Sequence, residues 1–224
     1  MEIIDQVGSM FAVGPFYYYV VDTRNINLLH VSKGIRNVLG VPSSSFSLEL
    51  LDDLIHPEDL AAIEKIIEFY SNTQEFELSN YKVSYLIRLK NFEGKYRTIL
   101  NQSKILGDTI EPEQKKIINI HTDISHLKIE QDFQISFTCS NRPSYHFDLI
   151  KKKPIITEKA TRNLSERERQ VIKLTAEGKK AEEIARLLYI SANTVNSHKR
   201  NIIKKHESKN MSQLIADLLR QGII

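Results

Sequence analysis

The chain lacks the features of a secreted or membrane protein. It has a single cysteine, Cys139, so it can form neither an internal disulfide nor a multi-cysteine metal site, as is usual in a reducing compartment. No stretch approaches the roughly 20 apolar residues that cross a bilayer. Glu2 and Asp5 precede the first apolar residues, where a secretory signal would be basic. We therefore expect a cytoplasmic protein with no membrane segment.

Patterns typical of catalytic sites are also missing. The sequence contains no G-x-S-x-G, no P-loop and no H-E-x-x-H motif, and it lacks the strand-end acidic cluster of a phosphate-accepting receiver domain. Paired acids such as Asp52–Asp53 and Glu182–Glu183 fall in predicted helices or their caps, where carboxylates are usually solvated. The sequence therefore predicts a protein that is not an enzyme.

The net charge of +3 hides a division along the chain. Residues 151–224 hold 17 Lys and Arg against 8 Asp and Glu, whereas residues 1–150 hold 14 against 20. A basic half joined to an acidic half favours nucleic-acid contact by the basic half. It also allows the acidic half to dock against the basic half.

The last sixty residues predict a cluster of short helices. Ser165 and Glu168 have the spacing of a capping box, and Gly178 supplies a residue that ends the first helix. A second helix is expected from Lys180 to Leu188, and Ser191 caps a third that continues to about residue 206.

The third helix has two different faces. Val195 and Ile202 point one way, toward a core. Amide, hydroxyl and basic side chains recur at spacings of three and four on the other side: Asn193, Asn196, Ser197, Arg200 and Lys204. Such groups hydrogen-bond to base edges and phosphates in a DNA major groove. The alternative is a basic helix face that is simply solvated.

These residues resemble the LuxR/GerE-type DNA-binding domain. The match runs from about Asn163 to Ile224 and includes Leu164–Glu168, Glu183–Ala185 and Thr194-Val195-x-x-His198. The resemblance implies a four-helix domain whose third helix enters the major groove. By position, Asn196, Ser197 and Arg200 would face bases. Backbone contacts would come from Lys179, Lys180, Thr194, Lys199 and Lys204.

The sequence departs from the family pattern in two places, at Asn196 and at the pair His206-Glu207, and the fourth helix carries a further expectation. Many members have Lys or Arg where Asn196 stands, so Asn196 is free to contact adenine. His206 and Glu207 replace a Leu-Gly pair before the fourth helix. In the family this helix often pairs with a second subunit, and the apolar candidates are Leu214, Ile215, Leu218 and Leu219. Packing within their own domain accounts for at least part of that stripe.

The first 125 residues alternate between strand and helix signals. The expected elements are strands 16–21 and 28–32, helices 34–39, 48–55 and from 56 onward, and strands 81–90, 96–105 and 117–122. This order resembles a PAS domain over about residues 14–128, as do Asp22, His56–Leu60, Asn91–Lys95 and His121–Ser125. The resemblance implies a five-stranded antiparallel sheet with flanking helices, which can enclose a small ligand or bind a partner.

We expect no cofactor in this module. Cys139 lies beyond the last strand, away from the position of a flavin-reactive cysteine. His30, His56, His121 and His126 are scattered, and each is read as a cap or a satisfied side chain rather than a haem ligand. The tyrosines are read as core and sheet packing: Tyr17, Tyr18, Tyr19, Tyr81, Tyr85 and Tyr96.

The predicted fold class is α+β, with three segments. Residues 1–128 form the PAS-like sensor, including an N-terminal helical cap, residues 129–162 a linker, and residues 163–224 the helix-turn-helix domain. Residues 128–137 read either as a helix or as a sixth strand, and residues 151–154 either as a solvated connector or as a basic arm on DNA.

Together these features predict a one-component transcription regulator. It would bind double-stranded DNA as a homodimer, under the control of an unknown small ligand or protein partner in the PAS-like module. The alternatives are a protein–protein adaptor without DNA binding and a cofactor-bearing redox or gas sensor.

Overall fold

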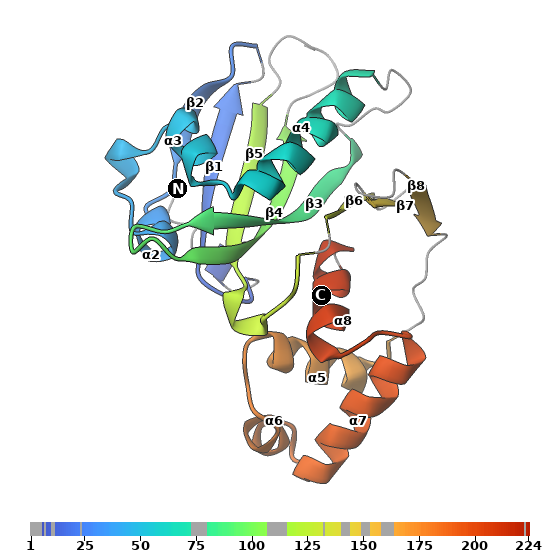
Figure 1. Cartoon of the computed structure of the whole chain (residues 1–224). Helices are drawn as coiled ribbons and strands as arrows, with labels where there is room; N and C mark the ends of the chain where they lie inside the picture. Colours follow the sequence, from blue (N-terminus) through green and yellow to red (C-terminus); the bar gives the residue numbers. More distant parts are fainter. Residues whose placement is uncertain are drawn as a thin grey trace.

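The protein is described here from a computed structural model, which covers residues 6, 8–9, 12–22, 24–72, 80–106, 116–131, 133–139, 144–148, 153–157, 164–221 and 223–224. These residues form an antiparallel sheet with helices on one face, followed by four C-terminal helices (Figure 1). The α+β class is as predicted. Most of the predicted N-terminal cap lies outside the described residues, as does the start of segment 151–154, which the sequence left open between a connector and a basic arm. Within the described chain, no helix is long and apolar enough to span a membrane.

All five predicted strands are present. They are β1 (Phe16–Asp22), β2 (Asn27–Val31), β3 (Lys82–Lys90), β4 (Tyr96–Leu106) and β5 (Lys116–Asp123). They pair antiparallel in the order β2-β1-β5-β4-β3. The β3–β4 hairpin turns at Gly94, whose φ of 78° is a left-handed conformation that suits glycine. The side-chain oxygen of Asn91 closes this turn by accepting from the Lys95 amide.

The sheet has eight strands, so the expectation of five is corrected. β6 (Gln134–Thr138), β7 (Ser144–Asp148) and β8 (Lys153–Thr157) continue it beyond β3 as an antiparallel meander. The reading of residues 128–137 as a strand holds for residues 134–138. An unpaired β3 would expose a row of backbone donors and acceptors, and pairing with β6 satisfies them from Lys82 to Tyr85. These strands are five residues each, too short to show a clear alternation of polar and apolar residues in the sequence.

Three helices and a 3-10 turn cover one face of the sheet, called here the inner face. They are α2 (Ile35–Leu39), the 3-10 turn η1 (Ser43–Ser45), α3 (Leu48–Leu54) and α4 (Pro57–Asn72). Odd-numbered sheet residues such as Tyr17, Ile87 and Ile99 point to this face and pack against Leu39 and Leu51 in one buried cluster. Because side chains alternate along a strand, the even-numbered residues of β3 and β4 point to the opposite, outer face.

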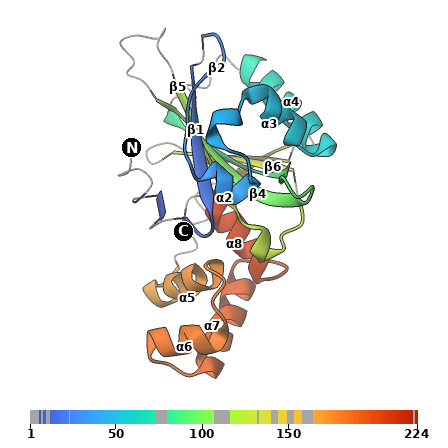
Figure 2. The same cartoon turned by 90° about the vertical axis from the view of Figure 1, so that its left-hand side faces the viewer.

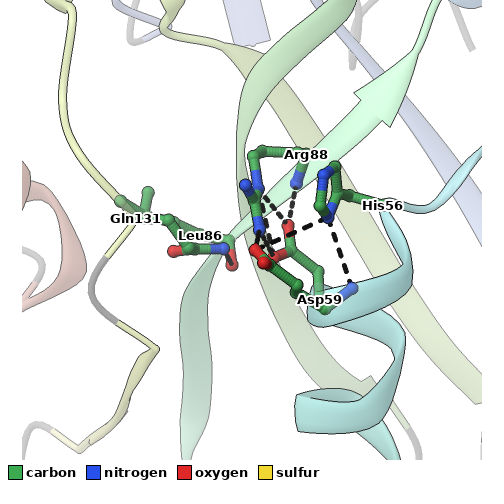
Figure 3. Close-up of polar contacts among 6 residues, drawn as sticks. His56, Asp59, Leu86, Arg88 and Gln131 are labelled. Atoms are coloured by element: carbon green, nitrogen blue, oxygen red, sulfur yellow. Dashed lines mark hydrogen bonds and ion pairs between the residues drawn. The ribbon is translucent and has the colours of Figure 1, made fainter.

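A charged network attaches α4 to the sheet (Figure 3). The guanidinium of Arg88 on β3 lies 2.6 Å from the Asp59 carboxylate, and it also binds Glu58 at 2.7 Å. The Arg88 backbone amide donates to the same Asp59 carboxylate, while the Arg88 carbonyl accepts from the His56 amide. Asp59 is only 2% exposed. The His56–Leu60 motif is therefore the point at which the helix is attached to its strand.

Four helices follow at the C-terminal end. They are α5 (Glu166–Ala176), α6 (Ala181–Leu188), α7 (Ala192–Lys205) and α8 (Met211–Arg220). The predicted capping box is confirmed, since Ser165 and Glu168 bond each other's amides, and Gly178 ends the first helix at a φ of 82°. Glu207 adopts a left-handed φ of 54° in the turn before α8.

The outer face of the sheet packs against the helical domain. One buried cluster joins Leu86 and Leu100 of the sheet to Ile172 of α5, Ile202 of α7 and the apolar residues of α8. Both views place α8 beside the sheet, with α6 at the far end of the molecule (Figures 1 and 2). The two parts of the chain therefore share a core.

Candidate nucleic-acid interface

The α6–α7 unit is held by a small core and by a tight turn. Val171, Ile184 and Val195 are fully buried and meet at Ala185, whose small side chain allows the helices to approach closely. The turn runs through Tyr189, whose φ of 54° is left-handed and whose side chain is 95% exposed.

Backbone groups at this turn are satisfied from both sides. The Ile190 amide donates to the Ala185 carbonyl at 3.0 Å, and the Arg167 guanidinium on α5 donates to the Leu188 carbonyl. These bonds fix the angle between α6 and α7. The orientation of α7 is thus set by three helices rather than by the turn alone.

The N-terminus of α7 is capped as predicted. Ser191 is in an extended conformation, and its hydroxyl accepts from the Thr194 amide at 3.0 Å. The Ser191 and Thr194 hydroxyls are also 2.8 Å apart. The remaining free amides of the first turn carry a partial positive charge, which favours a phosphate nearby.

The polar face of α7 points to solvent. Its exposed members are Asn193, Thr194, Asn196, Arg200 and Lys204, and Ser197 is half-buried. Val195 and Ile202 are fully buried on the opposite side. The Arg200 guanidinium makes only a long bond of 3.4 Å to the Ser197 hydroxyl among the bonds resolved here, so it can be redirected toward a base. The structure brings the predicted polar residues together on one accessible face.

The predicted phosphate contacts lie around this face. Lys179 and Lys180 are exposed at the start of α6, where the Lys180 amide donates to Glu183 at 2.7 Å. Lys199 lies on the flank of α7. Burial lowers the pKa of Lys199, while the nearby Glu182 opposes that shift. Lys199 is half-buried, unlike the exposed members of the polar face.

Sequence reasoning missed Asn201 and Lys205. Asn201 is exposed and follows Ser197 by four residues, so it extends the polar face; that spacing was a usable signal. Lys205 binds the Glu168 carboxylate at 3.0 Å and thereby joins the end of α7 to the start of α5. Nothing in the local sequence indicated this pairing, because the two residues are 37 positions apart.

The four apolar candidates for subunit pairing are buried inside this chain. Leu214, Ile215, Leu218 and Leu219 are 5% exposed or less, and all belong to the cluster between the helical domain and the sheet. In this arrangement they face the chain's own sheet and core. A second subunit would meet other surfaces unless α8 moved.

Three of the four histidines of the PAS-like module have partners within the protein. His121 Nδ1 lies 2.7 Å from the Tyr17 hydroxyl, His126 Nε2 lies 2.8 Å from the Ala176 carbonyl, and His56 stacks edge-on against Tyr96. The fourth, His30, lies against the Tyr18 ring, but its buried Nε2 has no hydrogen-bond partner among the described residues, so the expectation of a satisfied side chain is wrong for His30. No group of three or more metal-ligating side chains occurs among the residues that the structure describes. Two of the buried tyrosines, Tyr17 and Tyr19, pack against Phe46.

Comparison with known proteins identifies the C-terminal part. Residues 162–217 match the family model "Bacterial regulatory proteins, luxR family". The spore germination protein GerE of Bacillus subtilis is 42% identical over 59 residues, which are 26% of this chain and 80% of GerE. The chain belongs to the LuxR family. Residues 164–221 therefore show how its four family helices pack in this protein.

Other relatives match different lengths of this LuxR-family chain. The regulatory protein SdiA of Escherichia coli is 44% identical over 62 residues, 28% of this chain and 26% of SdiA. The chain thus spans about a quarter of SdiA. The CsgBAC operon transcriptional regulatory protein of E. coli is 29% identical over 77% of this chain and 73% of its own length.

A solved structure resembles the N-terminal part. It is the N-terminal domain of a diguanylate cyclase with a PAS/PAC sensor from Marinobacter aquaeolei, with 21% identity and a TM-score of 0.40. The match covers 49% of this chain and 95% of that domain.

Proposed function

We propose that this protein is a one-component transcription regulator. In this proposal residues 1–128 are a PAS-like sensor, residues 129–162 connect it, and residues 163–224 bind double-stranded DNA. The protein would act in the cytoplasm, where its DNA lies. The signal would be a small ligand or a protein partner of the PAS-like module.

The polar face of α7 is the observation that carries the proposal. It presents amide, hydroxyl and guanidinium groups to solvent, while Val195 and Ile202 anchor the opposite side in a core. These are the groups that distinguish base pairs in the major groove. We assign base contacts to Asn196, Ser197 and Arg200, a place on the same DNA-binding face to Asn193, and backbone contacts to Lys179, Lys180, Thr194, Lys199 and Lys204.

Binding as a dimer completes the proposal. Two copies of α7 related by a two-fold axis would reach major-groove segments about 34 Å apart, so the target would contain two inverted half-sites. The candidate pairing residues are Leu214, Ile215, Leu218 and Leu219. Their burial in the single chain means that pairing through them requires α8 to leave the sheet.

Selection of duplexes from a random pool tests the proposal directly. The full chain should enrich one inverted-repeat sequence, and its affinity should fall steeply with salt, because each neutralised phosphate contributes about −0.9 to the slope of log K against log salt. If no duplex is retained even at low ionic strength, the protein is not a DNA-binding regulator and the adaptor alternative takes its place. A visible absorption band in the purified protein would instead indicate a cofactor-bearing sensor.

A further inference from the structure

Helix α8 is buried around most of its circumference. Leu214, Ile215, Leu218 and Leu219, with Ala216 and Arg220, are all 5% exposed or less. At 100° per residue these positions spread over about 240° of the helix, well beyond the stripe of somewhat over 100° typical of a surface helix. Two different surfaces must therefore cover α8.

One of these surfaces is the helical domain and the other is the outer face of the sheet. The helical domain contributes Ile172, Ala176 and Ile202 to the cluster. The sheet contributes Leu86 and Leu100, which are direct cross-strand partners on β3 and β4. Ile124, Leu127 and Ile129, which follow β5, extend the sheet side.

Polar groups also lie in the contact between α8 and the sheet. Arg220 at the end of α8 is 1% exposed, is paired with Asp217 and acts electrostatically on His146 of β7. Ser136 on β6 bonds Nδ1 of this buried histidine at 2.7 Å.

The turn after β5 adds a second polar contact between the two parts. His126 Nε2 lies 2.8 Å from the carbonyl of Ala176 at the end of α5. The sheet and the helical domain are thus held in one orientation by hydrogen bonding as well as by apolar contact.

The same contact leaves the polar face of α7 open. Asn193, Asn196 and Arg200 remain exposed while α8 is covered. A chain in this arrangement can therefore approach a single half-site. In this arrangement the chain cannot present the apolar face of α8 to a second subunit.

We infer that the outer face of the sheet and a second subunit compete for α8, so that the sensor controls subunit pairing and leaves access of α7 to DNA unchanged. The inference rests on the proposed function for its DNA-bound dimer. Release of α8 exposes the pairing surface, and any signal that loosens the sheet side shifts the population toward dimers.

The first test weakens the sheet side alone. The double variant Leu86→Ala/Leu100→Ala removes the cross-strand pair that faces α8, whereas Leu106→Ala is the matched control. Leu106 lies on the same strand and face as Leu100, about 20 Å further on, and is 43% exposed. Sedimentation equilibrium of the full chain without DNA should show dimers at a concentration at least about ten-fold lower for the double variant, which corresponds to 1.4 kcal/mol. The control should match the unmodified chain.

The second test uses DNA and separates the competition for α8 from the proposed DNA-binding function. On a selected duplex with two half-sites, the double variant should bind at least about ten-fold more tightly than the unmodified chain. On a duplex with one half-site scrambled, the double variant and the unmodified chain should bind with equal affinity. Unchanged two-site affinity and unchanged self-association in a variant whose circular dichroism is intact would overturn the competition. Absence of binding to any duplex, with self-association still raised, would overturn the proposed function and leave the competition standing.

A third measurement does not depend on stability of the double variant. In a Cys139→Ser background, the thiol of a Leu100→Cys variant should react slowly with an alkylating reagent in the monomer and faster on the two-site duplex. An equal rate in both states would show that α8 keeps its place on the sheet, and the inference would be wrong.

Discussion

The hydroxyl of Tyr17 lies 2.7 Å from Nδ1 of His121, directly across the β1–β5 ladder. Burial lowers the pKa of His121 to about 3, and it raises the pKa of Tyr17. At neutral pH the imidazole is therefore uncharged and the phenol keeps its proton, so the Tyr17 hydroxyl donates to the ring nitrogen. This bond satisfies both polar groups in the apolar core of the PAS-like module.

Removing the donor should destabilise that module. Tyr17→Phe leaves Nδ1 of His121 buried without a partner, which costs about 1–3 kcal/mol. Urea unfolding at pH 7.5 measures the loss. Tyr96→Phe is the control, because Tyr96 is 46% exposed. Equal losses for the two variants would contradict the role given to the bond.

The protein should lose stability as the pH falls below about 6.5. The folded state holds His121 neutral down to about pH 3, whereas the unfolded chain takes up a proton near pH 6.5. The contribution is complete above pH 6.5 and declines between these values by about 1.4 kcal/mol per pH unit. Urea unfolding of the unmodified chain and of His121→Gln should diverge in slope over this range. Parallel pH profiles would show that His121 titrates normally.

The charged network that attaches α4 to the sheet predicts that two charge removals reduce stability by different amounts. Arg88→Met leaves the Asp59 carboxylate, 2% exposed, without its cation, and such uncompensated burial costs about 3–5 kcal/mol. Glu58→Gln removes a partner that is 66% exposed and should cost less than about 1 kcal/mol. Thermal unfolding of both variants checks the ranking. A reversed order would indicate that Glu58 rather than Asp59 holds Arg88.

Arg200 should contribute to sequence preference. Arg200→Ala is expected to weaken binding to the selected duplex by about 1–3 kcal/mol and to bind unrelated duplexes nearly as before. Lys173→Ala, on an exposed position of α5, removes the same charge away from the polar face. Fluorescence anisotropy at fixed salt compares the two. Equal specific affinity for Arg200→Ala and the unmodified chain would remove Arg200 from the base-contacting set.

Lys179 and Lys180 should act through phosphate. Replacing either with alanine should weaken binding to all duplexes alike and reduce the salt slope by about 1. The measurement is anisotropy from 50 to 300 mM salt. A loss confined to the selected sequence would instead indicate a base contact.

Local signals predicted most of the fold. The helix ends were predictable because caps act within four residues, as at Ser165, Gly178 and Ser191. β3 was predictable because polar and apolar side chains alternate along its nine residues, except at Leu86, which belongs to the cluster shared with the helical domain. The polar face of α7 also followed from spacing alone.

Contacts between distant segments were not predictable in the same way. The stripe on α8 shows that Leu214 and Leu218 are buried, but it does not show which surface buries them. Likewise, β6 to β8 carry too few residues for a period, and only their pairing beyond β3 identifies them. In both cases the deciding partner lies far away in the sequence.

The strand extension has a mechanical consequence for the helical domain. β8 ends at Thr157 and the described helical part begins at Leu164, seven residue steps later in the chain, so these two positions can never lie more than about 25 Å apart. A helical domain that has dissociated from the sheet remains near it at an effective concentration in the millimolar range. Rebinding of the helical domain to the sheet is then a first-order step within one molecule. To keep α8 exposed, a partner or a signal must persist for longer than this rebinding takes.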